Sequence, residues 1–264
     1  MTENRKIQIS FLMPALNEEA NIADALDHGR EAFDRSEISG EIIVVDDGST
    51  DKTARIVKEK MAEDKGERIK LIQHPRSRGV GASFRDGLKE ARGEIVAFMP
   101  GDDENEPGEI LRYFPLLREV DMVVPFVYNK EVRPPRRNLL SAIYRMIINI
   151  SFGVNFNYTN GTVLYRRSIL TDSPNTSNGF FFQTENIVRA ARRGYLFAEV
   201  PYRLDVRASG ESKAVSLRSL LSVIKNFLDL IKESHFSGRS LPAGLSPDSV
   251  SVKRRRGVRK VSLS

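Results

Sequence analysis

The sequence contains no cysteine, which excludes disulfide bonds and metal sites built from thiolates. It has no apolar run close to the roughly 18 residues that span a bilayer. The opening stretch MTENRKIQIS also lacks the apolar segment that is typical of a signal peptide. We therefore expect a cytoplasmic protein, in a compartment where thiols stay reduced, and we expect any membrane contact to be peripheral.

A broad basic surface is absent as well. The stretch from Lys253 to Lys260 carries six of the 41 Lys and Arg residues, and the remaining 35 equal the 35 Asp and Glu residues. The net charge of +6 therefore belongs to the end of the chain, and no nucleic-acid partner is expected. We predict one domain over residues 1–236 and a disordered basic tail over residues 237–264, where Gly, Pro, Ser and basic residues dominate. The tail either solubilises the protein or is attracted to anionic lipid headgroups.

Strand-like and helix-like segments alternate along the rest of the chain, which predicts an α/β fold with a mostly parallel central sheet flanked by helices. Strands are expected over residues 7–16, 41–47, 68–74, 94–99, 121–128, 159–170 and 196–204. Helices are expected over residues 17–33, 49–61, 79–93, 109–119, 139–153, 184–195 and 215–234. The last of these is an amphipathic helix near the C-terminus.

Three of the predicted strands end in polar sequences rich in acids. PALNEE follows the first strand, DDGSTD the second and PGDDE the fourth. Because ligands of open parallel sheets bind at the carboxyl ends of the strands, we expect these ends to form one site. Asp46 and Asp47 can accept hydrogen bonds from ribose hydroxyls or a base N–H, whereas Ser49, Thr50 and Asp51 also suit a helix cap. The acids after the fourth strand form either a solvated loop or a site for a divalent cation.

Several motifs occur in an order that resembles a known family. These are SFLMPALNEEANI, IIVVDDGSTDKT, RSRGVGASFRDGLKEARGEIVAFMPGDDENEP and RASGESK. They are similar to motifs of the inverting nucleotide-sugar glycosyltransferases of family 2, and most of all to those of the dolichyl- or polyprenyl-phosphate mannose and glucose synthases. The resemblance spans roughly residues 6–231. It implies a single GT-A (Rossmann-like) domain that binds a nucleoside diphosphate sugar.

The resemblance implies a donor site and a metal site. The residues that it implies in nucleotide-sugar binding are Pro14, Ala15, Asn17, Glu18, Asp46, Asp47, Arg78, Gly81 and Asp86. Members of the family carry an Asp-X-Asp pair and a Gln two residues later, and here the matching positions are Pro100, Asp102 and Glu104. Since a proline side chain cannot bind a metal, the implied ligands of Mg²⁺ or Mn²⁺ are Asp102 and Glu104.

The resemblance also implies residues for catalysis and for the acceptor. Arg207 and Lys213 of RASGESK would clamp phosphate, and together with Asp102 and Glu185 they are the implied catalytic residues. Glu185 lies where the family keeps a carboxylate near the acceptor, either as a general base for a hydroxyl or as an orienting residue. The residues implied in binding an acceptor phosphate are Arg137, Ser141 and Ser212.

The sequence thus predicts an inverting glycosyltransferase that moves a hexose from a nucleoside diphosphate sugar to a polyprenyl- or dolichyl-phosphate-type lipid at the cytoplasmic face of a membrane. The apolar helices within residues 141–152 and 215–231 either pack on the core or lie at the membrane surface, assisted by the basic tail. One alternative is transfer to a saccharide hydroxyl in surface polysaccharide synthesis, with Glu185 as base. Another is a nucleotide-sugar-binding protein without turnover, suggested by Pro100 and by the lack of a phosphate-binding Arg in PFVYNK.

Overall fold

A seven-stranded sheet forms the centre of the structure, a computed structural model that describes residues 6–64, 68–132, 134–203, 217–235 and 244–261. The strand order is β3-β2-β1-β4-β6-β5-β7. The strands are β1 (Ile9–Ala15), β2 (Gly40–Asp46), β3 (Ile69–Gln73), β4 (Ile95–Phe98), β5 (Met122–Val127), β6 (Leu164–Arg166) and β7 (Phe197–Tyr202). β6 runs antiparallel to β4 and β5, and the other paired strands are parallel. This mostly parallel sheet confirms the predicted fold class.

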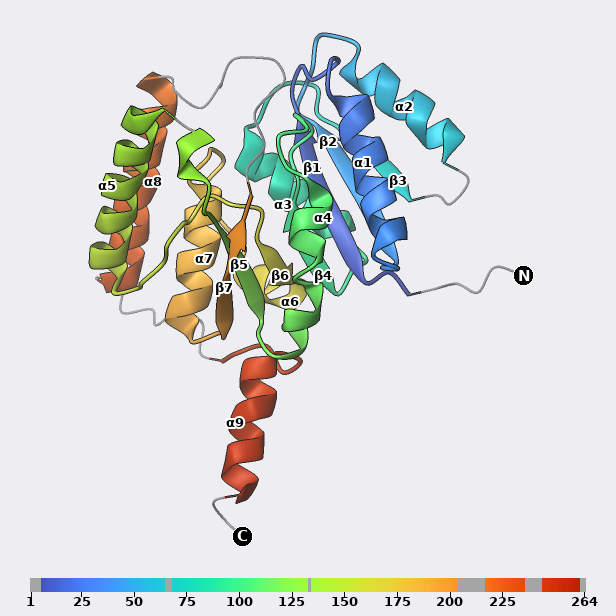
Figure 1. Ribbon diagram of the computed structural model, residues 1–264. Coiled ribbons are helices and arrows are strands. Elements are labelled where there is room, and N and C mark those ends of the chain that lie inside the picture. The colour runs from blue at the N-terminus through green and yellow to red at the C-terminus, as the bar shows by residue number, and fades with distance from the viewer. Residues whose placement is uncertain (1–5, 65–67, 133, 204–216, 236–243, 262–264) are drawn as a thin grey trace.

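Helices cover both faces of the sheet (Figure 1). One face carries α1 (Ile22–Arg35), α2 (Thr53–Glu63), α4 (Pro107–Leu111) and the 3₁₀ helix η1 (Phe114–Arg118). The other face carries α3 (Val80–Glu90), α6 (Arg167–Thr171) and α7 (Phe182–Arg193). β1 and β2 are buried over their whole length, and this burial on both faces explains why their sequences are continuous apolar runs.

The register of three neighbouring strands brings the acidic strand ends together. β1 lies between β2 and β4, and Ala15 pairs with Asp46. Beyond β4, the N–H of Gly101 donates to the carbonyl of Pro14 at 3.1 Å. The ends of β2 and β4 therefore flank the end of β1 at one edge of the sheet, which we term the carboxyl edge.

Several boundaries differ from those predicted. α1 and α2 begin later than expected, at Ile22 and Thr53, because the polar residues before them form loops. The predicted helix over residues 109–119 is divided into α4 and η1, and Pro115, which has no N–H to donate, lies in the first turn of η1. The predicted strand over residues 159–170 is shortened to β6, and α6 follows directly.

Two helices stand beside α7 and form the end of the molecule farthest from α2 (Figure 1). They are α5 (Pro135–Phe152), which follows the short 3₁₀ helix η2 (Lys130–Val132), and α8 (Leu217–His235). Phe152 and Phe181 both pack edge-on against Phe227 in the small core that α5, α7 and α8 share. The amphipathic helix predicted near the C-terminus is therefore present, and it packs on the core with one side only.

The prediction of a disordered tail is wrong for the residues that form α9 (Val250–Val261). Asp121, fully buried beside β5, accepts hydrogen bonds from the N–H groups of Val250 (2.6 Å) and Ser251 (3.1 Å). A carboxylate distant in the sequence thus caps the helix, which a reading of the tail's own composition could not reveal. α9 leaves the body at the edge opposite the carboxyl edge (Figure 1).

Candidate functional site

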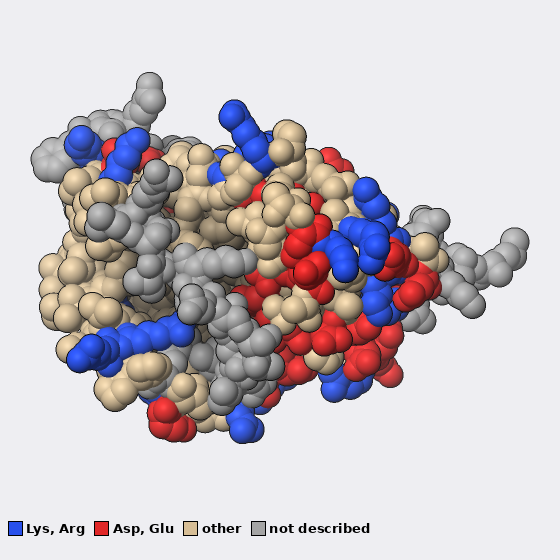
Figure 2. Space-filling view, turned by 90° about the horizontal axis from the view of Figure 1, so that it is seen from above, with Lys and Arg blue, Asp and Glu red and all other residues tan. Residues whose placement is uncertain are grey.

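The carboxyl edge is acidic on one side only. Figure 2 looks onto this edge and shows Asp and Glu side chains gathered over the half that α1 and α2 border. The half formed by α5 and α8 shows few charged side chains in the same view. An anionic ligand beside so many carboxylates requires cations, which a metal ion or guanidinium groups can supply.

Hydrogen bonds lock the loop after β1 to the loop after β2. The N–H of Asn17 donates to Ser49 Oγ (2.9 Å), and Asn17 Oδ1 accepts from the N–H of Thr50 (2.8 Å). The N–H of Glu18 donates to Thr53 Oγ1 at 2.8 Å. Asn17 has a left-handed backbone (φ 53°), which Asn tolerates better than most residues. Ser49 and Thr50 therefore join two loops rather than cap α2.

Asp46 lies at the end of β2, between the ends of β1 and β3, and is 2% exposed. Its Oδ1 accepts from the N–H of Ser49 at 3.0 Å, and its Oδ2 lies 3.5 Å from Gln73 Nε2. These contacts fix the orientation of the buried carboxylate at the carboxyl edge. The position suits the contact with a base or ribose that the sequence predicts.

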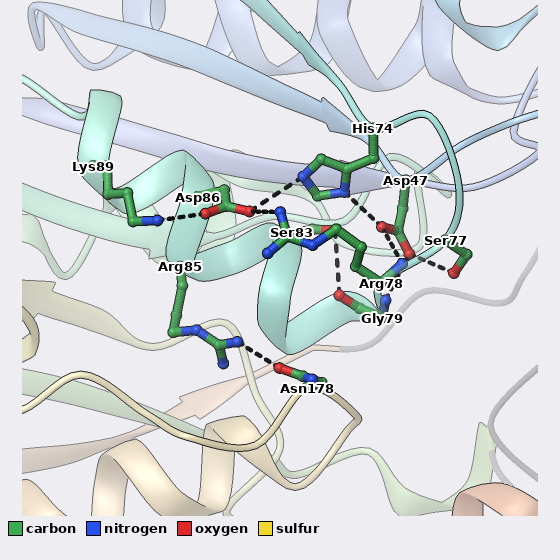
Figure 3. A network of polar contacts seen from close by, with 10 residues as sticks. All are labelled: Asp47, His74, Ser77, Arg78, Gly79, Ser83, Arg85, Asp86, Lys89 and Asn178. Carbon is green, nitrogen blue, oxygen red and sulfur yellow. Dashed lines mark hydrogen bonds and ion pairs between the residues drawn. The ribbon is translucent and has the colours of Figure 1, made fainter.

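The structure gives Asp47 a different role from the predicted nucleotide contact. Its buried carboxylate accepts hydrogen bonds from His74 Nδ1 (2.7 Å), Ser77 Oγ (2.7 Å) and the N–H groups of Arg78 and Gly79 (2.9 Å each), as Figure 3 shows. Burial acts to raise the pKa of Asp47, but these bonds hold it below its usual value. Asp47 thus shapes the loop after β3 instead of presenting its oxygens to a ligand.

A chain of polar contacts links this loop to α3 (Figure 3). Arg78 Nη1 lies 2.6 Å from Asp86 Oδ2, and His74 Nε2 lies 3.3 Å from the same oxygen. Burial acts to raise the pKa of Asp86, but Lys89, at 2.7 Å, and the other cations lower it below its usual value. Asp86 therefore supports the half-exposed Arg78 rather than facing a ligand itself. Sequence reasoning missed His74, because its place between two carboxylates is set only by the fold.

Gly81 is required for the packing of α3 against the loop at residues 175–178. Its N–H donates to the carbonyl of Asn178 at 2.7 Å, and a Cβ at this position would lie 2.2 Å from the carbonyl oxygen of Ser177. A Cβ on Gly79, which has a φ of 94°, would lie 2.5 Å from the carbonyl oxygen of Asn178. These glycines permit a close approach of two protein segments. The nucleotide contact that the resemblance implies for Gly81 stays a prediction.

The turn after β4 holds the predicted metal ligands. Asp102 Oδ1 accepts a hydrogen bond from the N–H of Glu104 at 3.2 Å, so the turn folds around this carboxylate. Between them, Asp103 has a left-handed backbone (φ 56°), and its Oδ1 lies 2.9 Å from Nδ1 of His28 on α1. The bond to Asp103 raises the pKa of His28, while burial raises the pKa of Asp103 more than the same bond lowers it.

Asp102 and Glu104 fit a divalent cation only if a bound substrate supplies further oxygen atoms to it. Across residues 6–64, 68–132, 134–203, 217–235 and 244–261, no group of three or more His, Cys, Asp or Glu side chains is placed to hold a metal ion. Both carboxylates are partly buried in the turn, and their hard oxygens suit Mg²⁺ or Mn²⁺. The oxygens of a bound diphosphate would complete such a site.

Glu185 is neither a solvated helix residue nor an available base. It is 1% exposed and accepts hydrogen bonds from the N–H and hydroxyl of Thr176 (2.8 and 3.0 Å), the N–H of Ser177 (2.9 Å) and Nε of Arg189 (3.0 Å). Its oxygens are thus engaged in holding the loop that packs against α3. This geometry disagrees with a general base and agrees with an orienting residue.

The residues predicted to meet the acceptor are described only in part. Arg137 is exposed and Ser141 is partly exposed, and their four-residue spacing near the start of α5 places them on one face of the helix. Arg207, Ser212 and Lys213 lie outside the described residues.

A model of the family described as Glycosyl transferase family 2 matches residues 10–173. The matched region contains all three strand ends and the acidic turn described above. The chain therefore belongs to glycosyl transferase family 2, and it is a glycosyltransferase. This confirms the family and the enzyme class that the sequence predicts.

Relatives with named activities match most of the chain but only part of their own length. A dolichyl-phosphate beta-glucosyltransferase of Trichomonas vaginalis is 29% identical, over 86% of this chain and 71% of that protein. A dodecaprenyl-phosphate galacturonate synthase of Rhizobium johnstonii is 28% identical, over 63% of this chain and 50% of that protein. An undecaprenyl-phosphate 4-deoxy-4-formamido-L-arabinose transferase of Pseudomonas fluorescens is also 28% identical, over 83% and 63%.

Solved structures share the fold at lower identity. Glucosyl-3-phosphoglycerate synthase of Mycobacterium tuberculosis in complex with Mn²⁺, UDP-glucose and phosphoglyceric acid has a TM-score of 0.61 at 23% identity, over 85% of this chain and 79% of that one. The same enzyme in complex with UDP has a TM-score of 0.62 at 22% identity, over 85% and 80%. At this level of identity the likeness concerns the fold alone, and it confirms the predicted GT-A fold.

Proposed function

We propose that this protein transfers a hexose, with inversion at the anomeric carbon, from a nucleoside diphosphate sugar to a polyprenyl- or dolichyl-phosphate-type lipid. The three named relatives are transferases or synthases of dolichyl, dodecaprenyl and undecaprenyl phosphates. In this chain, the observation that carries the proposal is a strip of exposed apolar side chains on α5 and α8. Both helices begin at the carboxyl edge (Figure 1).

The apolar strip lies on the outward sides of the two helices. Leu140 is 68% exposed, Ile150 75% and Leu221 59%. The other members of the strip are Leu139, Ile143, Met146, Ile147, Leu220, Ile224 and Leu228. Exposed apolar surface of this extent marks an interaction site, and a helix whose apolar side is exposed can lie in the interfacial layer of a bilayer. Of the helices that the structure describes, none has the length and apolar character needed to cross a membrane.

This strip, rather than the basic end of the chain, is the proposed membrane contact. α9 carries the described basic residues Lys253, Arg254, Arg255 and Arg256, but it leaves the molecule at the opposite edge from the start of the strip (Figure 1). Peripheral contact through the strip would hold the enzyme at the cytoplasmic face of a membrane and keep the carboxyl edge beside a lipid acceptor.

The donor would lie over the ends of β1, β2 and β4. Its nucleoside and diphosphate would be bound by Pro14, Ala15, Asn17, Glu18, Asp46 and Arg78. Asp102 and Glu104 would hold Mg²⁺ or Mn²⁺, which neutralises charge on the departing diphosphate when it is bound. Arg207 and Lys213 remain predicted to clamp the same phosphates.

The state of Glu185 favours a phosphate acceptor over a sugar hydroxyl. A hydroxyl must lose its proton to a base as it attacks, whereas a lipid phosphate is already an anion at neutral pH. Glu185 has its oxygens engaged by Thr176, Ser177 and Arg189, so the hydroxyl alternative loses the base predicted for it. Arg137 would bind the acceptor phosphate at the start of α5, where the apolar strip also begins.

The test is a transfer assay with radiolabelled UDP-, GDP- and dTDP-hexoses and undecaprenyl phosphate in vesicles. We expect label in the lipid fraction with Mn²⁺ or Mg²⁺ and at least a tenfold loss of transfer with EDTA, because the metal offsets the charge of the leaving group. Parallel reactions contain soluble oligosaccharides as acceptors. Label found only in the oligosaccharides would contradict the lipid acceptor, and a donor that binds without turnover would favour the non-catalytic alternative.

Glu substitutions in the apolar strip are expected to weaken vesicle binding. Burying one aliphatic side chain contributes about 1.5–3 kcal/mol, so replacing Leu140, Ile150 and Leu221 by Glu should weaken binding to vesicles at least about tenfold. Co-sedimentation with phosphatidylcholine–phosphatidylglycerol vesicles measures the bound fraction. Met61, 37% exposed on α2, provides the control, and Met61→Glu should leave binding unchanged. Unchanged binding of the triple variant would show that the strip is not the contact.

A further inference from the structure

The spacing of the two predicted metal ligands depends on the residue between them. Asp102 and Glu104 are joined through Asp103, so the φ and ψ angles of Asp103 set how the two flanking carboxylates lie relative to each other. Asp103 has a φ of 56°, in the left-handed region that residues other than Gly adopt infrequently. A backbone conformation of this kind persists when surrounding contacts hold it in place.

His28 of α1 supplies such a contact. Its Nδ1 lies 2.9 Å from Oδ1 of Asp103, across 75 positions in the sequence. The side chain of Asp103 is 24% exposed and that of His28 is 45% exposed, so the contact is partly shielded from water. Asp103 is thereby directed toward α1 and is not offered together with its two acidic neighbours.

Other contacts hold the two ends of the same turn. At its start, the N–H of Gly101 donates to the carbonyl of Pro14 at 3.1 Å. After it, Asn105 Oδ1 accepts from Thr162 Oγ1 and from the hydroxyl of Tyr202, both at 3.3 Å. These contacts position the ends of the turn, and the contact of His28 acts between the two carboxylates.

We propose that His28 is a positioning residue for the metal site, which it organises by holding Asp103 in the left-handed conformation that sets the spacing of Asp102 and Glu104. The proposal rests on the proposed function, because it assumes that these two carboxylates bind a divalent cation together with a nucleoside diphosphate. His28 acts through Asp103 and touches neither donor nor metal. Without the contact of His28, Asp103 would leave the left-handed conformation. The carboxylates of Asp102 and Glu104 would then no longer have the spacing that binds the metal.

The experiment compares His28→Leu with His28→Asn. Mn²⁺ binding is measured from the loss of the free Mn²⁺ signal in electron paramagnetic resonance, with UDP or GDP present. We expect His28→Leu to weaken Mn²⁺ binding about five- to tenfold. His28→Asn should stay within about twofold of the unaltered protein, because the amide Nδ2 can occupy the place of Nδ1 and donate to Asp103.

Arg35 provides a matched control from the same helix. Its guanidinium reaches Glu106 of the same turn at 3.4 Å, but its side chain is 63% exposed, so Arg35→Leu should leave Mn²⁺ binding unchanged within about twofold. Thermal melts of each variant, recorded without metal, show whether the fold is kept.

The outcomes separate this inference from the proposed function. If the unaltered protein does not bind Mn²⁺ in the presence of UDP or of GDP, the metal site itself fails and the inference fails with it. If the unaltered protein binds Mn²⁺ and His28→Leu binds equally well, only the role of His28 is overturned. Equal weakening by His28→Leu and His28→Asn would also overturn it, because a role through the donated hydrogen bond requires rescue by Asn.

Discussion

Asp102→Asn is expected to lower kcat/KM for sugar transfer at least about 100-fold while the melting temperature stays within about 2 °C. The substitution removes the charge that would hold the metal against the diphosphate, and electrostatic groups at a developing charge typically contribute about 2.7–4 kcal/mol to a barrier. The fold should be kept, because the Asn carbonyl oxygen can still accept the hydrogen bond that Asp102 Oδ1 receives from the N–H of Glu104. Initial rates over a range of Mn²⁺ concentrations measure the effect.

Glu109→Gln is the control for this substitution. Glu109 lies in the first turn of α4, shortly after the acidic turn, and its carboxylate pairs with Arg112 at 3.2 Å. Neutralising it should leave transfer within about twofold, since surface ion pairs contribute little. Full activity of Asp102→Asn would remove this residue from the metal site.

Asp47→Ala is expected to lower the free energy of unfolding by about 3 kcal/mol or more. The substitution removes the shared acceptor of the buried His74 ring and of the partly buried donors of Ser77, Arg78 and Gly79, and a hydrogen bond to a charged group contributes about 1.5–3 kcal/mol. Binding of the nucleoside diphosphate sugar should weaken as well, because the loop that carries Arg78 loses the hydrogen bonds that hold it. Urea unfolding followed by circular dichroism measures the stability change.

Asp34→Ala provides the control for the loss of a carboxylate. Asp34 pairs with Arg68 at 2.7 Å, but its side chain is 67% exposed, so we expect a loss below about 1 kcal/mol. Similar stability of Asp47→Ala and Asp34→Ala would contradict the structural role of Asp47.

The stabilisation by Asp47 should also depend on pH. Its pKa is lowered from 3.8, so the folded state favours the ionised carboxylate more than the unfolded state does. The contribution is therefore fully present above the unfolded value of 3.8 and is lost as the pH falls through the lower folded value. The stability difference between the unaltered protein and Asp47→Ala should become smaller as the pH falls below 3.8.

The architecture and the place of the site could be predicted because they depend on local patterns. Apolar runs that end in PALNEE, DDGSTD and PGDDE indicate parallel strands whose carboxyl ends carry ligand-binding residues. The structure places the ends of β1, β2 and β4 side by side, which brings Asp46 and the turn at Asp102 to one edge. The order of these motifs also predicted the family that the comparison confirms.

The sequence could not predict the roles of residues whose hydrogen-bond partners are supplied by the fold. The resemblance implies a nucleotide contact for Asp47, and for Glu185 it leaves a general base and an orienting residue open. Their actual neighbours are Ser77, 30 positions from Asp47, and the backbone of the loop before α7 for Glu185. The composition of the tail predicts disorder, whereas the carboxylate that caps α9, Asp121, lies 129 positions away from Val250.

By itself, the sequence determined that the chain forms an α/β fold with acids at the ends of three strands, because the apolar pattern of consecutive residues indicates which segments are buried strands. Only the tertiary structure decided which of these acids hold loops, since a carboxylate is directed by the donors that the fold brings to it. It likewise decided that the apolar sides of α5 and α8 face outward, because an amphipathic pattern specifies an apolar side but not the surface that covers it.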